Sequence, residues 1–595
     1  MKSSSLSLCS LALLGSLLTG CAELAPPDHP EVTIAPEPEP AAPEAAPVIV
    51  SNENIPNLPL TDEIVFKVVS AEVAFQRGDF PAAFATTIAL AQQTKDPRLT
   101  KRAMEMALIN KQPLQAFLAA RLWHDYSPNS DEATQYYLGF MVMNNNLDEV
   151  ATLVAQRLAA ASPKERGLQM LQTENLVMRN TNKEAAFTML EKLYAPYPDY
   201  IEAHLALAQA AFTSNNHVRA MVEARAAMNL NPESQLAALT LAQVSPSPDE
   251  ALAALDDFVS KNPSAQETRR AYAGMLVEQK QFIRARQQFE LLSSGKPQDA
   301  GISYTLGVLS LQLNDIPAAE KYLLEFVRLL EVTPAEQRDP TSAFLYLSQI
   351  ADERHDGANA VDWLAKIQSY DGKNAAYFNA QQRRALLIAK YQSLSAAQQF
   401  LHELPATTNE KIQLLQLEAE LLRNADQNAE AATLLQQAIS NYPDNQDLLY
   451  DFAMTAEKLE HFDEMETALR QVIKLNPENQ QACNALGYSL ADRNIRLPEA
   501  RALIEKALSL APNDAFILDS MGWLEFREHK NETALAFLLK AYKLRPDIEI
   551  AVHASEVLWM MGDEQKAKIL LKEAQQKDAT NASLKTLLER LNIQL

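Results

Sequence analysis

The side chains that most often bind metals or catalyse reactions are scattered along this chain. No two of its nine histidines stand four residues apart, and the HExxH, GxSxG and Walker patterns are absent. Adjacent acids such as Asp256 and Asp257 point in different directions on a helix, so they do not form a carboxylate pair. The sequence therefore predicts no catalytic residue, no metal site and no cofactor, and we expect a protein that is not an enzyme.

The three cysteines have separate predicted roles. Cys9 lies in an apolar leader, Cys21 ends that leader, and Cys483 is the only cysteine in the rest of the chain. A single thiol cannot form an internal disulfide, even in an oxidising compartment. Cys483 stands four residues before Gly487 at a helix-packing position, so we expect a buried, unreactive thiol rather than a nucleophile.

Prolines recur at a nearly fixed interval along most of the chain. Near the C-terminus, Pro443, Pro477, Pro512 and Pro546 are separated by 34, 35 and 34 residues, and similar spacings extend back to Pro97. A period of this length is typical of a solenoid, in which each unit buries its apolar face by stacking on the next. We therefore expect about fifteen units of roughly 35 residues after residue 60.

Small residues keep the same period as the prolines. In the unit that ends at Pro546, Gly522 is followed by Ala534 and Ala541, and neighbouring units carry Gly or Ala at matching positions. Two helices cross closely only where one or both lack bulk, so these positions predict contacts between helices. The chain resembles the tetratricopeptide repeat family, whose units are pairs of antiparallel helices about 34 residues long. The resemblance implies an all-α, right-handed superhelical solenoid of such hairpins.

The turns inside the expected hairpins share a short pattern. Residues 77–83, 313–319 and 561–567 each place Gly or Asn before Asp. Gly or Asn suits the end of one helix, and Asp suits the start of the next. The period breaks at 329–344, where we expect a hinge. We therefore divide the repeats into three parts: TPR-like helical repeats at 60–330, irregular helical repeats at 331–410, and a C-terminal array at 411–595.

Aromatic residues recur in the expected first helices of the C-terminal units, which line the concave side in the repeat register. Tyr488 and Trp523 stand 35 residues apart, so they occupy one position in successive units. Together with Phe526 and Trp559, these rigid side chains could anchor an apolar peptide. The alternative is that they fill the packing between repeats.

A second matching position carries polar residues. Asn484 and Asp519 also stand 35 residues apart and could pair with a peptide backbone. The chaperone-binding members of the repeat family use Lys, Asn and Arg here to grip a C-terminal carboxylate. This chain lacks that set, so we do not expect that activity.

Residues 1–20 have the features of a secretory signal peptide: one Lys, an apolar run and then small residues. Leu18-Thr19-Gly20-Cys21 resembles the bacterial lipobox, which implies that the chain is cut before Cys21 and that this cysteine is lipidated. An ordinary soluble secreted protein is the alternative. Ala22, rather than Asp, follows the cysteine, which by resemblance to the lipoprotein sorting pattern favours the outer membrane, with the protein facing the periplasm.

Residues 21–59 join this anchor to the repeats. Residues 25–59 hold ten prolines, six acids and no Lys or Arg, so we expect an extended, disordered tether. The formal net charge of −23 argues against nucleic acid as a partner and against attachment to anionic lipid through basic residues. We therefore expect contact with the membrane through the lipid anchor only.

A lipid anchor, a proline-rich tether and a repeat array resemble the outer-membrane lipoprotein adaptors of periplasmic carboxyl-terminal processing proteases. The resemblance implies a scaffold that binds such a protease and its substrates, often cell-wall hydrolases. The alternative is an assembly or export factor for an envelope machine, in polysaccharide export, pilus secretin assembly or outer-membrane protein insertion. Both interpretations predict periplasmic proteins as partners.

Overall fold

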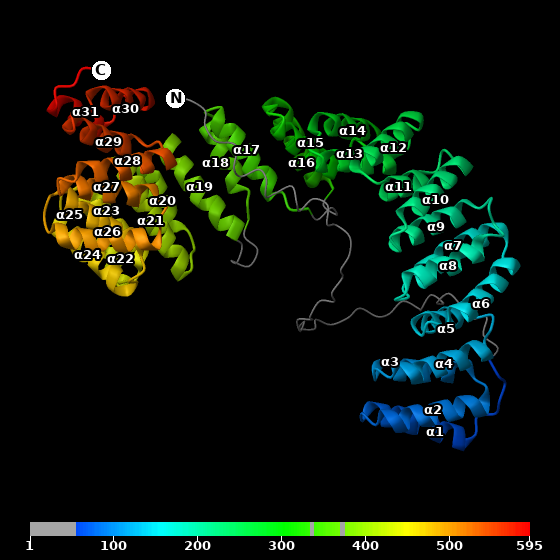
Figure 1. Ribbon diagram of the computed structural model, residues 1–595. Helices are drawn as coiled ribbons and strands as arrows, with labels where there is room; N and C mark the ends of the chain where they lie inside the picture. The colour runs from blue at the N-terminus through cyan, green and yellow to red at the C-terminus, as the bar shows by residue number, and fades with distance from the viewer. Residues whose placement is uncertain (1–54, 334–337, 369–374) are drawn as a thin grey trace. The chain divides into compact units, whose positions relative to one another are not determined.

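The computed structural model describes residues 55–333, 338–368 and 375–595. Within these ranges the chain forms 31 α-helices and no strands (Figure 1). The helices belong to two compact units, Met1–Pro196 and Tyr197–Leu595. The predicted signal peptide, the predicted lipid site at Cys21 and the tether up to residue 54 lie outside the described residues.

The first unit contains eight of these helices: α1 (Asp62–Gln76), α2 (Phe80–Thr94), α3 (Pro97–Ile109), α4 (Pro113–Tyr126), α5 (Asp131–Met143), α6 (Leu147–Ala160), α7 (Pro163–Val177) and α8 (Lys183–Tyr194).

The second unit begins with helices α9 (Ile201–Thr213), α10 (His217–Leu230), α11 (Gln235–Val244), α12 (Pro248–Lys261), α13 (Gln266–Glu278), α14 (Phe282–Gly295), α15 (Ala300–Gln312), α16 (Ile316–Val332), α17 (Thr341–Glu353), α18 (Gly357–Ala365), α19 (Ala375–Tyr391) and α20 (Leu394–Glu403). It continues with α21 (Thr408–Asn424), α22 (Asn428–Asn441), α23 (Gln446–Lys458), α24 (Phe462–Leu475), α25 (Gln480–Asp492), α26 (Leu497–Leu510), α27 (Ala515–Arg527), α28 (Asn531–Leu544), α29 (Ile548–Met560), α30 (Glu564–Lys577) and α31 (Ala582–Arg590).

Each helix packs mainly against its neighbours in the chain, so that one helical hairpin follows another within each unit (Figure 1). In the C-terminal array the odd-numbered helices are the first members of their hairpins and also pack on one another, as α25 does on α27 and α27 on α29. The prediction of an all-α solenoid of helical hairpins is therefore confirmed.

The turns inside the hairpins follow the predicted pattern. The Gly or Asn that ends the first helix has a positive φ, which is 81° at Gly78, 57° at Asn314 and 86° at Gly562. The aspartate after each of them accepts a hydrogen bond from the backbone N–H three residues later, at 3.2 to 3.3 Å. One residue therefore reverses the chain and the next satisfies a free N–H at the start of the second helix.

The small residues lie where the helices cross, as the sequence predicts. A Cβ atom added to Gly522 on α27 would stand 2.6 Å from Leu538 Cγ and 3.1 Å from the Ala534 carbonyl oxygen on α28. One hairpin earlier, a Cβ atom on Gly487 would stand 2.6 Å from Ile504 Cγ1. A side chain at either glycine would push the two helices of its hairpin apart.

The periodic prolines mark the joints between hairpins in two ways. Pro97 and Pro163 are the first residues of α3 and α7, where a missing N–H leaves no helical hydrogen bond unmade. In the C-terminal array, Pro477 and Pro512 instead stand two residues before the N-caps Asn479 and Asp514. In both arrangements the proline falls between hairpins and not within a helix interior.

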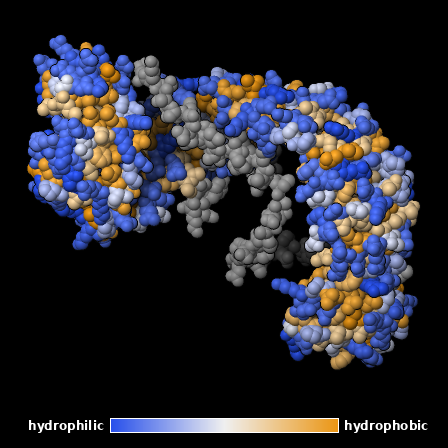
Figure 2. Space-filling view, in the orientation of Figure 1, coloured by the Kyte–Doolittle hydropathy of each residue, from blue (hydrophilic) through white to orange (hydrophobic). Residues whose placement is uncertain are grey.

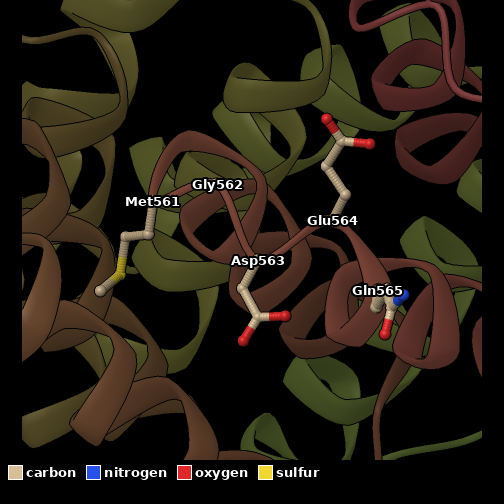
Figure 3. A pocket seen from close by; sticks show the side chains of 5 residues that line it. All are labelled: Met561, Gly562, Asp563, Glu564 and Gln565. Atoms are coloured by element: carbon tan, nitrogen blue, oxygen red, sulfur yellow. The ribbon is translucent and has the colours of Figure 1, made fainter.

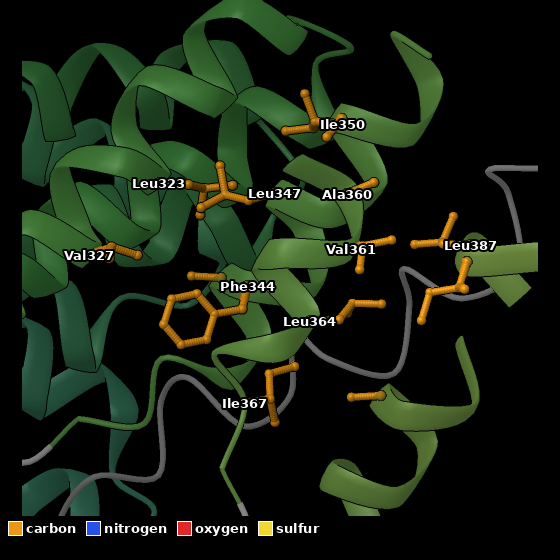
Figure 4. Close-up of a cluster of buried hydrophobic side chains, with 14 of the residues drawn as sticks. Leu323, Val327, Phe344, Leu347, Ile350, Ala360, Val361, Leu364, Ile367 and Leu387 are labelled. Carbon is orange, nitrogen blue, oxygen red and sulfur yellow. The ribbon is translucent and has the colours of Figure 1, made fainter. Parts of the chain in front are cut away.

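One buried cluster extends across the stretch where the period breaks. Leu323 of α16, Phe344 of α17, Leu364 of α18 and Leu387 of α19 all belong to it (Figure 4). Residues 334–337, inside the predicted hinge at 329–344, lie outside the described residues. The hinge and the three-part division of the repeats therefore stay predictions. In the part of the chain that the structure describes, no helix is both long and apolar enough to cross a membrane.

Candidate functional site

Three successive first helices, α25, α27 and α29, carry polar residues at one repeat position. Asn484 and Asp519 stand 35 residues apart, and His553 follows Asp519 by 34. Tyr488 and Trp523 hold another matching position, one helical turn further along α25 and α27. We call the surface that these five residues form the first-helix face.

A buried ion pair lies at the centre of the first-helix face. His553 Nδ1 lies 3.0 Å from both carboxylate oxygens of Asp519, and only 8% and 6% of the two residues are exposed. Burial is the largest single influence on the His553 pKa, and it lowers that pKa. The negative charge of Asp519, its hydrogen bond to the ring, and the charges of Glu549 and Asp492 all raise the pKa, and together they outweigh the effect of burial. The net effect is a raised pKa, which favours the imidazolium form.

Tyr488 reaches the same histidine from two repeats away. Its hydroxyl oxygen lies 3.4 Å from His553 Nε2, although the two residues are 65 positions apart. Helices α25 and α29 can touch past α27 only if the first helices converge on this side, so the first-helix face is locally concave. Burial raises the pKa of Tyr488 well above its usual range, so its hydroxyl keeps its proton.

Trp523 packs over this pair and is almost fully covered, with 4% of the residue exposed. Its indole ring stacks on the His553 ring with centroids 4.2 Å apart, and its Nε1–H donates to Asp492 Oδ1 at 2.9 Å. The Arg527 guanidinium lies 4.8 Å from the indole centroid and donates to the same Asp492 oxygen at 3.1 Å. Trp523 therefore joins α25, α27 and α29 through its ring and its N–H.

The other predicted residues lie around this cluster or apart from it. Phe526 is half-buried and packs beside Trp523 with the two rings tilted by 37° and their centroids 5.2 Å apart. Asn484 is partly buried, and its Oδ1 atom is buried without a hydrogen-bond partner in the protein. Trp559 packs instead on the cluster of α29 to α31, beneath the Lys568 ammonium group.

The structure thus brings Tyr488, Asp519, Trp523 and Phe526 together and leaves Trp559 in a different cluster. The burial of Trp523 favours the interpretation in which it packs between repeats. Whether any of the six predicted residues touches a partner stays a prediction.

Sequence reasoning missed three residues that complete the network, namely His553, Asp492 and Arg527. The signal for His553 was present, because it continues the interval from Asn484 to Asp519. Asp492 and Arg527 also stand 35 residues apart, and a side chain bridging two successive first helices needs this spacing. The nine histidines appear scattered when they are considered one by one. When they are compared by repeat position, His553 falls at the position that Asn484 and Asp519 share.

Polar contacts one repeat apart continue along earlier first helices. Gln416 of α21 donates to Asp451 of α23 at 2.8 Å. On α23, burial raises the pKa of the Glu457 carboxyl, and the nearby negative charge of Asp492 raises it further. A polar contact between side chains one repeat apart therefore joins α21 to α23 as well.

Two features of the described residues bear on reactivity: their one cysteine, and the arrangement of their His, Cys, Asp and Glu side chains. Cys483 is fully buried, and burial raises its thiol pKa, in agreement with the predicted unreactive thiol. Among the described residues, no group of three His, Cys, Asp or Glu could hold a metal ion. A shallow pocket lined by Met561 to Gln565 opens at the turn between α29 and α30 (Figure 3). Its Asp563 side chain is already used, because it caps α30 and pairs with Lys566 at 2.7 Å.

Two stretches of the C-terminal array match tetratricopeptide repeat models, residues 415–445 and 450–515. A curated TPR repeat-containing protein of Pseudomonas aeruginosa is 39% identical over 216 residues, which are 36% of this chain. The match covers 36% of that relative as well, so the chain spans about a third of the length of the curated protein it matches.

Two solved structures are similar at a lower level. A tetratricopeptide repeat protein from Parabacteroides merdae aligns with a TM-score of 0.34 and 16% identity, over 42% of this chain and 97% of that one. A TPR protein from Thermus thermophilus aligns with a TM-score of 0.28 and 19% identity, over 30% of this chain and 99% of that one. These scores are too low to support an argument, and the fold assignment comes from the helices themselves. The chain thus combines a helical-hairpin architecture with two stretches, 415–445 and 450–515, that are similar to tetratricopeptide repeats.

Proposed function

We infer that the chain is a scaffold that binds other proteins through the first-helix face and the half-buried aromatic side chain at its edge, Phe526. One observation carries this inference: a network of Tyr488, Asp519, Trp523 and His553 fixes three successive first helices on their concave side. A surface whose side chains are already locked loses little entropy when a partner binds.

The division of labour within this face follows from burial. Trp523 and His553 hold the helices in place and are covered, so they act as support. Phe526 and Asn484 are partly exposed, so they are the side chains left to contact a bound segment. An aromatic anchor beside a backbone-pairing amide suits an extended or helical peptide of another protein.

We further propose where the scaffold lies and which proteins it binds. Lipidation at Cys21 would hold the scaffold at the outer membrane, facing the periplasm. The resemblance of this architecture to the adaptors of carboxyl-terminal processing proteases supports a protease of that kind, together with its cell-wall hydrolase substrates, as the bound proteins.

The experiment is crosslinking in intact cells followed by purification of the chain, with three forms compared: wild type, Phe526→Ala and Leu539→Ala. Leu539 lies on α28, the second helix of the same hairpin, and is 44% exposed, which makes it a matched control. We expect wild type and Leu539→Ala to recover a processing protease and Phe526→Ala to recover several-fold less. Recovery of secretin, barrel-insertion or polysaccharide-export components instead would replace the adaptor function with an assembly or export function.

A further inference from the structure

The first helix of the first unit is apolar on two sides. One side of α1 packs on α2 through partly and fully buried side chains such as Val68 and Ala71. The other side exposes Val65, Phe66, Val69 and Val73, with exposed fractions from 38% to 71%. We call these four residues the α1 stripe. Figure 2 shows apolar side chains at the surface of this end of the unit.

A solenoid normally ends in a unit with a polar outer side, because nothing stacks on it. Helix α31, at the other end of the described chain, follows this rule: Lys585, Thr586, Glu589 and Arg590 are exposed, and the leucines face inward. The α1 stripe breaks the rule. Three further apolar residues just before α1 are exposed as well, namely Ile55, Leu58 and Leu60.

We propose that residues 45–50 of the same chain, Ala-Ala-Pro-Val-Ile-Val, dock on the α1 stripe and cover it. Val48, Ile49 and Val50 are the only three consecutive branched apolar residues between Cys21 and residue 54. The rest of that segment consists largely of Pro, Glu and Ala, so it offers no comparable match for an apolar stripe.

The connection is long enough for this docking. Residues 51–61 separate Val50 from the start of α1, and eleven residues can span up to about 36 Å. The 15 residues of α1 extend over about 22 Å. The segment can therefore turn back and lie along any part of the stripe.

The size of the stripe favours a segment of the same chain over a second copy. A face about 22 Å long and about 10 Å wide offers roughly 200 Å², whereas a stable dimer buries about 800 Å² on each partner. A short connection instead supplies an effective concentration in the millimolar range, for which a small contact is enough.

The charges around the stripe argue against a membrane surface as its occupant. Helices that lie on membranes carry Lys and Arg on their polar side. Here the first turn of α1 is acidic, and its only Lys, Lys67, is paired with Glu63 at 2.6 Å. Residues 45–50 carry no charge, so they can approach without an electrostatic penalty.

The test is hydrogen–deuterium exchange of α1 in the full chain. A variant with Val48→Asn, Ile49→Asn and Val50→Asn is compared with a control carrying Val32→Asn and Ile34→Asn, which changes the same kinds of residue further upstream. We expect the amides of residues 62–76 to exchange at least threefold faster in the first variant and at the wild-type rate in the control. Equal rates in all three proteins would overturn the proposal.

Two further measurements separate the other occupants. Val69→Asn, which changes the stripe itself, should raise exchange as much as the change in the segment does, and combining the two changes should add nothing. Protection that falls when wild type is diluted, with a dimer seen by sedimentation, would assign the stripe to a second copy. Protection that appears only when phospholipid vesicles are added would assign it to a membrane. Either result would overturn docking within the chain.

Discussion

Asp519 and His553 stand 34 residues apart, one repeat in the sequence, and their side chains meet at 3.0 Å in the fold. The contact ties α27 to α29 and supports the indole ring of Trp523, which stacks on the imidazole. A repeat protein gains its stability from contacts between neighbouring units. This pair is such a contact, and it forms the buried centre of the first-helix face, which we propose for partner binding.

Replacing His553 by Gln should destabilise the C-terminal repeats by about 3 kcal/mol near pH 6, because it leaves the Asp519 carboxylate buried without its charged partner. Urea unfolding followed by tryptophan fluorescence measures this. The surface change His529→Gln, in the turn before α28, is the control and should have little effect.

The same pair predicts a dependence on pH. Since the fold raises the pKa of His553, the stability from its protonated form is fully present below the unfolded value of about 6.5 and is lost as the pH rises through the folded value. The difference between wild type and His553→Gln should therefore be larger at pH 6 than at pH 9. An equal difference at both pH values would show that folding does not raise the pKa of His553.

Glu174 on α7 gives a separate prediction for the first unit. It is buried, with 6% of the residue exposed, and burial raises its pKa to about 7. When the fold raises the pKa of a carboxyl, the protein loses stability as the pH rises from the carboxyl's pKa in the unfolded chain, about 4.3, through its pKa in the folded chain. Glu174→Gln should therefore stabilise the unit by about 2 kcal/mol more at pH 8.5 than at pH 5.

The measurement uses the full chain. Hydrogen exchange in α7, followed as the urea concentration is raised at each of the two pH values, gives the unfolding midpoint of the first unit. Glu184, exposed in the first turn of α8, provides the control Glu184→Gln. If the stability gained by Glu174→Gln did not change with pH, the fold would not raise the pKa of the Glu174 carboxyl.

Gly522→Ala should cost about 1–3 kcal/mol, because the new methyl group would stand 2.6 Å from Leu538 Cγ at a helix crossing. Gly139→Ala on α5 is the matched control, since its methyl group would meet only Leu176 Cδ1, at 3.8 Å. The control should gain up to about 1 kcal/mol from helix propensity. Thermal melting and local hydrogen exchange around each glycine distinguish the two variants. Equal effects of Gly522→Ala and Gly139→Ala on stability would mean that α27 and α28 can move apart at no cost in free energy.

Changing Cys21 to Ala should abolish acylation, because this thiol is the proposed lipid acceptor. Metabolic labelling with a fatty acid measures it, and exchange in the described helices should stay as in wild type. Fatty-acid label retained on the Cys21→Ala variant would contradict lipidation at Cys21.

The fold was largely predictable, because hairpin turns and helix crossings depend on local residue types. Gly78, Asn314 and Gly562 reverse the chain where the pattern of Gly or Asn before Asp predicted, and Gly522 lies at its predicted crossing. Such features need only the conformational freedom of glycine or asparagine and the absence of bulk.

The candidate site was only partly predictable. The position shared by Asn484 and Asp519 was read from the spacing, but the pairing of Tyr488 with His553 across two repeats depends on how strongly the array curves. Curvature is the sum of many small packing contacts and leaves no motif. For the same reason, the sequence could not show that Trp523 would be covered while Phe526 stays partly open.

The most direct test of partner binding at the first-helix face is site-specific photocrosslinking in living cells. A photoreactive phenylalanine analogue replaces Phe526 in one strain and Leu539, on the outer helix of the same hairpin, in another. We predict a discrete crosslink from position 526 to a periplasmic carboxyl-terminal processing protease and none from position 539. Crosslinks of equal yield from both positions, or from position 539 alone, would contradict binding at this face.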